Sequence, residues 1–155
     1  HIMIQTLLTG RGAVPAQPLN QQSAIMDAHM LADRILTVIG EDVVPLTKAG
    51  VAKGDKVFGA AILRKSDFSL VVAGTNEETV NPLHHGEVSA LNAWYKLPKE
   101  ARPSPTDCIF VATHEPCSLC LSAITWAGFD NFTYFFRYGP GLSCSSLLPG
   151  SRHSH

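Results

Sequence analysis

The chain has 155 residues, of which 45% are hydrophobic and 16% are charged, and its formal net charge at pH 7 is −1. This composition is typical of one globular domain and excludes a disordered chain. The near-neutral charge disfavours a protein that binds nucleic acid mainly by electrostatics, and no apolar run approaches the roughly 18 residues that a membrane helix needs.

The first half of the chain predicts two helices followed by a β-hairpin. Residues 1–19 contain several glycines and prolines and are expected to be irregular. Apolar residues then recur at three- and four-residue steps from about residue 20 to 39, which predicts a helix that ends at Gly40. A short helix is predicted over 45–52, and the apolar runs 57–63 and 69–74 predict two buried strands joined by a turn.

The second half predicts helices that alternate with strands. Residues 75–82 form a loop, and a helix over 85–96 carries Val88, Leu91 and Trp94 on one face. A proline-rich loop leads to a strand at 108–112, a helix that opens at Pro116 and ends at Gly128, and a strand at 131–136. This order predicts one α/β domain over residues 1–136, with helices on both faces of a sheet and crossovers between parallel strands. The segment 137–155 has no clear period and is expected to be a disordered or atypical tail.

Two short motifs lie at the predicted starts of the last two helices. Cys117 and Cys120 are three residues apart, so their sulfurs face the same side and form a good two-ligand bite for zinc. Helix N-termini carry unpaired amides and a partial positive charge, which stabilise thiolates. His85, at the other helix start, is the natural third ligand. Three protein ligands leave one tetrahedral position open, as in catalytic zinc sites.

Glu87 lies two residues beyond His85, where its carboxylate can exchange a proton with a zinc-bound water without ligating the metal. Each motif alone is a weak signal. Cys117 and Cys120 could form a redox pair, His114 could close the site as a fourth ligand, and Glu87 could be a first-turn acid favoured by the helix dipole. Together, however, the motifs follow the pattern H-x-E…P-C-x-x-C, which is the signature of zinc-dependent base deaminases.

The two motifs also resemble those of a known family. "NPLHHGEVSAL" and "THEPCSLCLSAI" resemble the zinc motifs of the cytidine deaminase-like superfamily, and "VFGAAIL" and "AGTN" resemble the strand pair that lines its pocket. The Glu-Pro-Cys form is closer to the guanine deaminase and tRNA adenosine deaminase branch than to the small cytidine deaminases. The resemblance covers about residues 43–136.

The resemblance implies a three-layer α/β/α sandwich with a mixed sheet of about five strands. It implies a zinc ion (Zn²⁺) held by His85, Cys117 and Cys120, with Glu87 as the proton shuttle. It also implies substrate contacts from three residues: a hydrogen bond from Asn76 to the base, packing of Phe58 on the ring, and the backbone N–H of Gly86 facing a base carbonyl. Gly86 stands where the family usually has alanine.

The implied reaction is hydrolytic removal of an exocyclic amine from a nucleobase or nucleoside, in a homodimer. Near-neutral charge favours a guanine-like base or a related small heterocycle over tRNA. Two alternatives remain, a tRNA adenosine deaminase and a zinc-stabilised binding module without catalysis. Four cysteines are too few for a disulfide scaffold in a chain of this length, so we expect a cytosolic protein.

Overall fold

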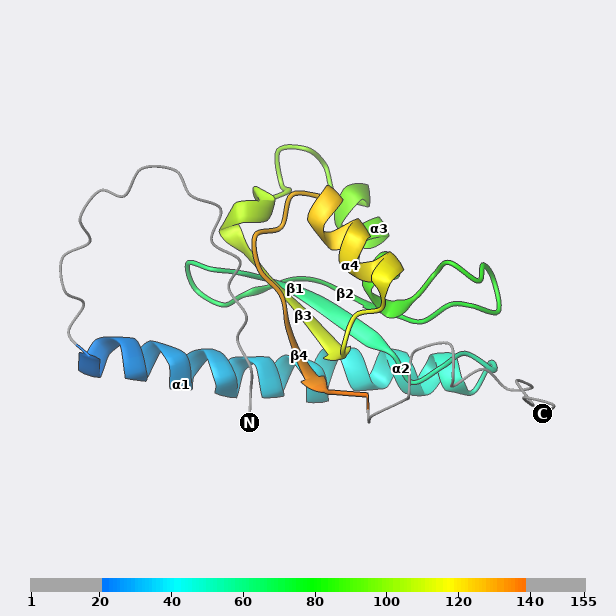
Figure 1. Cartoon of the computed structure of the whole chain (residues 1–155), viewed down its shortest axis with the longest axis horizontal. Coiled ribbons are helices and arrows are strands. Elements are labelled where there is room, and N and C mark those ends of the chain that lie inside the picture. Colours follow the sequence, from blue (N-terminus) through cyan, green and yellow to red (C-terminus); the bar gives the residue numbers. More distant parts are fainter. Residues whose placement is uncertain (1–20, 139–155) are drawn as a thin grey trace.

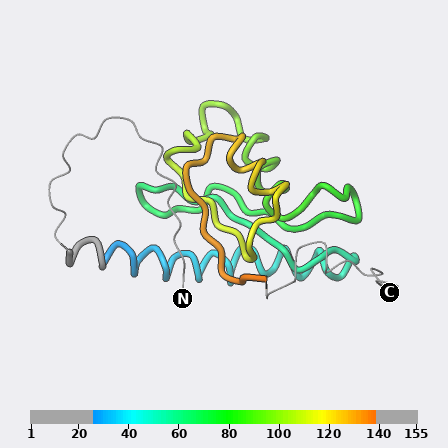
Figure 2. The backbone as a smooth tube through the Cα atoms, in the orientation of Figure 1, coloured from blue at the N-terminus to red at the C-terminus, as the bar shows by residue number. Residues whose placement is uncertain are grey.

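The computed structural model describes residues 21–138 and arranges them in three layers (Figures 1 and 2). A long helical run lies along one face of a sheet, and two shorter helices, α3 (Gly86–Lys96) and α4 (Ser118–Trp126), cover the other face. The predicted α/β/α sandwich is therefore confirmed. The predicted irregular segment 1–19, and residues 139–155 of the predicted tail, lie outside the described residues.

The sheet is mixed, and its strands run in the order β2-β1-β3-β4. Its strands are β1 (Gly59–Arg64), β2 (Leu70–Thr75), β3 (Cys108–His114) and β4 (Thr133–Phe136). β1 pairs antiparallel with both β2 and β3, whereas β4 runs parallel to β3. Each strand corresponds to one predicted from the sequence. The described part of the chain thus forms a sheet of four strands, one fewer than the resemblance implies.

The helical run is continuous, and the prediction that Gly40 ends the first helix is wrong. Three elements follow one another without a break: α1 (Gln21–Val38), the π-helical turn η1 (Ile39–Val43) and α2 (Val44–Val51). The N–H of Val44 bonds to the carbonyl of Ile39, five residues back, immediately before Pro45. A proline has no N–H and clashes with the carbonyl four residues back in an α-helix. The wider π-turn accommodates Pro45 and lets the helix continue.

Two apolar clusters form the core, one on each face of the sheet. Successive strand residues point to opposite faces, so β1 contributes to both clusters. The cluster under α3 and α4 includes Ala60, Ile62, Leu91, Trp94, Phe110 and Ile124. The cluster under the helical run includes Ile35, Val38, Val43, Ala61, Leu63 and Val111. Of the predicted α3 face, Leu91 and Trp94 are buried and Val88 is only partly so.

Three glycines let the layers approach each other closely. A Cβ atom on Gly59 would collide with the side chain of Val43 in η1, and one on Gly74 would collide with the backbone of Ala90 in α3. A Cβ atom on Gly86 would lie 2.8 Å from the Cα atom of Gly59. The first turn of α3 therefore rests directly on the backbone of β1, which fixes the position of the residues at its start.

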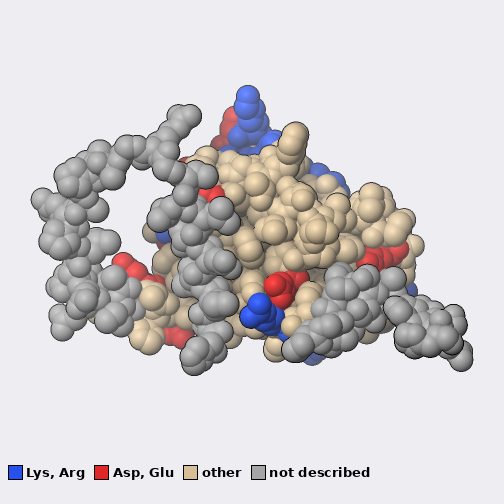
Figure 3. Space-filling model, viewed as in Figure 1, with Lys and Arg blue, Asp and Glu red and all other residues tan. Residues whose placement is uncertain are grey.

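The end of α4 follows the sequence prediction. Gly128 has φ = +92°, a conformation that favours glycine. Its N–H bonds to the carbonyl of Thr125, and the N–H of Phe129 bonds to the carbonyl of Ile124, which together form a Schellman motif. None of the described helices is long and apolar enough to cross a membrane. On the face shown in Figure 3, charged side chains lie in small separate groups among uncharged residues.

Candidate metal centre and active site

His85 and Cys117 occupy the same position at the starts of two different helices. Both are N-cap residues with extended backbones, His85 before α3 (φ −63°, ψ 161°) and Cys117 before α4 (φ −69°, ψ 171°). The prediction that Pro116 opens the last helix is therefore wrong, because α4 begins at Ser118. Strand pairing continues to Glu115, whose N–H bonds to the carbonyl of Phe136, so the next two residues make the turn into the helix.

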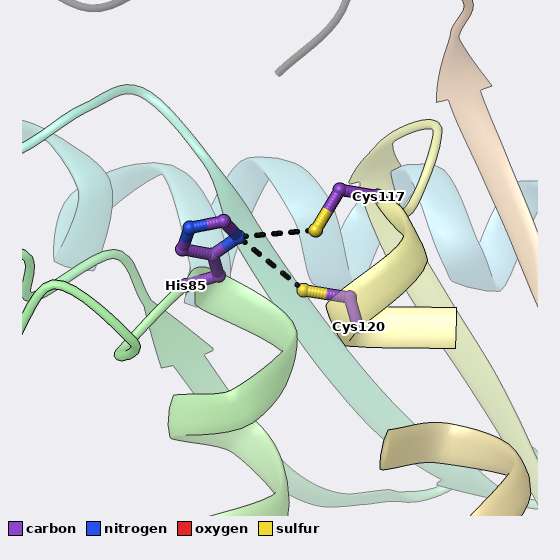
Figure 4. Close-up of side chains that lie close together, drawn as sticks. All are labelled: His85, Cys117 and Cys120. Carbon is purple, nitrogen blue, oxygen red and sulfur yellow. Dashed lines mark hydrogen bonds between the residues drawn. The ribbon is translucent and has the colours of Figure 1, made fainter. Parts of the chain in front are cut away.

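The three predicted zinc ligands converge in space (Figure 4). The Nδ1 atom of His85 lies 3.4 Å from the Sγ atom of Cys117 and 3.5 Å from that of Cys120. All three ligand atoms lie within 4.8 Å of one another. For tetrahedral zinc, bond lengths of about 2.3 Å to sulfur and 2.0–2.1 Å to nitrogen place two such ligand atoms about 3.6 Å apart. The donor set and its geometry therefore fit zinc.

His114 does not belong to this group. Among the described residues, the group of His, Cys, Asp and Glu side chains that could hold a metal consists of the three predicted ligands. The Nδ1 atom of His114 lies 3.0 Å from the hydroxyl of Thr113, and its ring packs against Phe58 and Phe136. His114 also lines a cavity of about 420 Å³ beside α2. A closed site with His114 as fourth ligand is thus not supported, and a three-ligand set is typical of catalytic zinc.

Glu87 points toward the metal centre. Its side chain is buried, and its Oε2 atom lies 3.3 Å from the Sγ atom of Cys120, which donates to it. Burial raises the pKa of Glu87, and burial together with the Glu87 carboxylate raises the pKa of the Cys120 thiol. Negative charge here is unfavourable without a cation, and a divalent ion would reverse that balance. Glu87 lies in the first turn of α3, as the helix-dipole alternative also requires, but its side chain is buried against the ligand cluster.

The predicted substrate residues lie near one another. The side chain of Asn76 is fully buried, and its Oδ1 atom accepts the N–H groups of Lys56 (3.1 Å) and Glu78 (3.3 Å). Its Nδ2 atom has no hydrogen-bond partner among the described residues, so the amide keeps a free donor. The backbone N–H of Asn76 donates to the carbonyl of Phe58, whose ring is buried edge-on against His114.

Glu78 contacts His85 although neither sequence motif contains it. Its Oε1 atom lies 3.1 Å from the Nε2 atom of His85, and its Oε2 atom lies 2.8 Å from the Nζ atom of Lys56. The sequence contains two adjacent acids, Glu77 and Glu78, and only the turn that follows Asn76 decides which one faces His85. The only sequence signal for this contact is an acidic residue a few positions before His85. Glu77 is exposed and accepts a hydrogen bond from Ser89 instead.

Comparisons with known proteins agree with this site. A guanine deaminase from Bacillus subtilis (strain 168) is 36% identical over 72 residues, which are 45% of this chain and 44% of that protein. The X-ray structure of a guanine deaminase from Bacillus subtilis matches with a TM-score of 0.51 and 31% identity, over 61% of this chain and 60% of that one. The chain therefore spans about half the length of these relatives.

A tRNA:A34 deaminase structure matches with a TM-score of 0.50 over 68% of this chain and 79% of that one. At 20% identity, this likeness concerns the fold alone. The family model for the cytidine and deoxycytidylate deaminase zinc-binding region matches residues 41–136, which contain the sheet, both ligand-bearing helices and the three converging side chains. The chain therefore belongs to the cytidine and deoxycytidylate deaminase family and carries its zinc-binding region.

Proposed function

We propose that this domain is a zinc-dependent hydrolase that removes an amine from a nucleobase or nucleoside. One observation carries the proposal: a buried carboxylate, Glu87, lies 3.3 Å from a sulfur of the three-ligand cluster. In this proposal His85, Cys117 and Cys120 hold the ion, and Glu87 is the catalytic residue. The family match over residues 41–136 supports it.

Glu87 carries out the proton transfers. When bound, zinc supplies a Lewis acid that lowers the pKa of a coordinated water toward about 7. The Glu87 carboxylate accepts one proton from the water while the water oxygen bonds to the carbon that bears the amine, and it delivers this proton to the adjacent ring nitrogen. It then takes the second proton of the former water, now a hydroxyl on that carbon, and passes it to the amine. The carbon–nitrogen bond breaks, ammonia leaves, and a carbonyl replaces the amine on the ring.

In this proposal, residues at the ends of β1 and β2 and at the start of α3 orient the substrate. The free Nδ2 donor of Asn76 suits an acceptor atom on the base, such as a ring nitrogen or a carbonyl oxygen. The proposal gives the backbone N–H of Gly86 a second acceptor and places the base ring against Phe58. A guanine-like heterocycle is the first candidate, because a guanine deaminase sequence and a guanine deaminase structure, both from Bacillus subtilis, match this chain at more than 30% identity over part of their length.

Charge and surface chemistry support two further parts of the proposal. The scattered charges in Figure 3 suit a small substrate better than a polyanion such as tRNA. Leu119 and Trp126, seven residues apart, lie on one face of helix α4, and both side chains are exposed, Trp126 to 95%. We assign this face to the contact between two copies in a homodimer. The described cysteines are all free thiols, in keeping with a cytosolic protein.

Metal analysis combined with an ammonia-release panel tests the proposal. The zinc-loaded protein is incubated with free bases, nucleosides, nucleotides and tRNA, and released ammonia is measured beside the zinc content. Ammonia from guanine or a related free base or nucleoside supports the proposal. Ammonia release from tRNA alone supports the alternative, a tRNA adenosine deaminase. Bound zinc without ammonia from any substrate identifies a non-catalytic binding module. Sedimentation of wild type and W126E tests the homodimer.

A further inference from the structure

Glu78 lies directly behind the candidate metal ligand His85. The Nδ1 atom of His85 faces the two cysteine sulfurs, whereas its Nε2 atom faces the Oε1 atom of Glu78 at 3.1 Å. A neutral imidazole has one donor and one acceptor nitrogen, so an Nε2–H that donates to Glu78 leaves the Nδ1 lone pair free for a metal. The two ring nitrogens thus have different partners on opposite sides of the ring.

The surroundings hold the Glu78 carboxylate in this position. Lys56 contacts both of its oxygens, Oε1 at 3.1 Å and Oε2 at 2.8 Å. The side chains of Lys56, Glu78 and His85 are only 13–17% exposed, so this chain of contacts is largely shielded from water. Asn76 adds a third restraint, since its Oδ1 atom accepts the backbone N–H groups of both Lys56 and Glu78.

We propose that Glu78 is a positioning residue that fixes the tautomer and ring orientation of His85 and thereby sets the metal affinity of the site. Carboxylates that accept the second N–H of a metal-bound histidine orient the ring and raise its basicity. Lys56 balances the charge of the carboxylate and restricts its rotamers. Asn76 therefore has a structural task as well as its proposed contact with the base, because it joins the backbones that present Lys56 and Glu78.

Zinc affinity is the primary readout, measured on the full chain by competition with a chromophoric chelator. Three variants are compared with wild type: E78A, E78Q and the neighbouring control E77Q. E78A loses the acceptor for Nε2–H and is expected to bind zinc about 10–100-fold more weakly. E78Q keeps an amide oxygen that can accept this proton, so it should lose less affinity. Glu77 is next to Glu78 in the chain, but its side chain contacts Ser89 and not His85. E77Q therefore removes a neighbouring charge and should bind zinc as wild type does.

Cobalt(II) absorption separates positioning from general stability. The visible bands of the cobalt-loaded protein report the ligand field, and E78A and E78Q should shift them while E77Q does not. Zinc affinities and cobalt spectra of E78A and E78Q that equal those of E77Q overturn the inference. If E78A does not fold, the comparison of E78Q with E77Q still decides it.

The inference rests on the proposed zinc site but does not require turnover, so the two proposals fail separately. A protein whose zinc affinity depends on Glu78 but that releases no ammonia contradicts only the proposed deaminase. A deaminase whose zinc affinity is indifferent to Glu78 contradicts only the positioning role.

Discussion

The Nδ1 atom of His85 lies 3.4 Å from the Sγ atom of Cys117, and each of these residues is the N-cap of its own helix. Two helix N-termini therefore meet at one point. Each contributes unpaired backbone N–H groups and about half a positive charge. With zinc bound, the two thiolates and the Glu87 carboxylate would bring excess negative charge to this point, and the two helix N-termini would offset part of it.

Replacement of Glu87 by glutamine should separate metal binding from catalysis. The amide keeps the size of the side chain but cannot accept and return protons, so E87Q should keep its zinc. Turnover should fall by about 10²–10⁴-fold, the usual contribution of general acid–base catalysis. Steady-state ammonia release and the zinc content of the same sample check this. The exposed Glu100 provides the control E100Q, and an E87Q rate near that of wild type contradicts the role.

Loss of one sulfur ligand should remove the metal and weaken the fold. C117A is expected to lose more affinity than the about 10–100-fold that outer-shell substitutions cost. A bound ion at a free concentration of 100 times its dissociation constant stabilises the folded state by about 2.7 kcal/mol. Thermal unfolding with and without a chelator measures this difference, which should be large in wild type and absent in C117A. C108A alters a buried core cysteine outside the cluster and should retain the zinc-dependent difference.

The metal-free protein should lose stability as the pH rises above the ordinary pKa of Glu87. Burial raises the pKa of Glu87 from its usual value of 4.5, so the folded state holds this proton at pH values where the unfolded state has released it. Stability contributed in this way is present at low pH and falls as pH rises through that window. Urea unfolding of chelator-treated wild type and E87Q at several pH values measures the effect, which should vanish in E87Q.

A second, partly buried group, His114, acts in the opposite direction, which makes the comparison with E87Q necessary. Burial lowers the pKa of His114 below its usual value of 6.5. The folded state therefore resists protonation of His114, and stability from this residue is lost as pH falls below that value. His114 is common to both proteins, so the difference between their profiles isolates Glu87. Profiles that run parallel across the acid range contradict an ionisation penalty at Glu87.

Alanine substitutions at two glycines should have effects of opposite sign. Gly59 is enclosed by Val43 and neighbouring backbone, so G59A should destabilise the fold by about 1–3 kcal/mol through overpacking. Gly40 lies in the helical run with nothing within 4 Å of an added Cβ atom. G40A should stabilise by about 0.5–1 kcal/mol, because it removes backbone freedom from the unfolded chain. Chemical denaturation of both variants checks the pair, and equal signs contradict the close packing at Gly59.

Local patterns were sufficient to predict most of the fold. Apolar periodicity predicted the four α-helices and four strands of the described region within a few residues, because each element buries one face or both. It did not predict the π-helical turn Ile39–Val43 or the short 3-10 helix Pro105–Asp107, which lies in the segment predicted as a loop. The errors lie where a local signal competes with longer-range structure. Gly40 predicts a helix end, but the π-turn before Pro45 keeps the helix intact. Pro116 predicts a helix start, but strand pairing of Glu115 delays the start to Ser118.

Some residues of the candidate site could be predicted from the sequence, and others could not. His85, Cys117 and Cys120 could be predicted because zinc ligation demands few residue types at restricted spacings. Glu78 could not, because its contact with His85 depends on the path of an irregular loop in which Glu77 is chemically equivalent. The burial of Glu87, which raises its pKa, likewise follows from packing between α3 and the rest of the domain and not from the motif itself.

The close contact between Gly86 and the backbone of β1 limits which residue can replace this glycine. A methyl group at this position would lie 2.8 Å from the Cα atom of Gly59 in β1, so the strand already occupies the space. An alanine here would therefore require the first turn of α3 or the backbone of Phe58 and Gly59 to shift. Since His85 directly precedes Gly86, the contact that seats the helix on the strand also holds the imidazole in place.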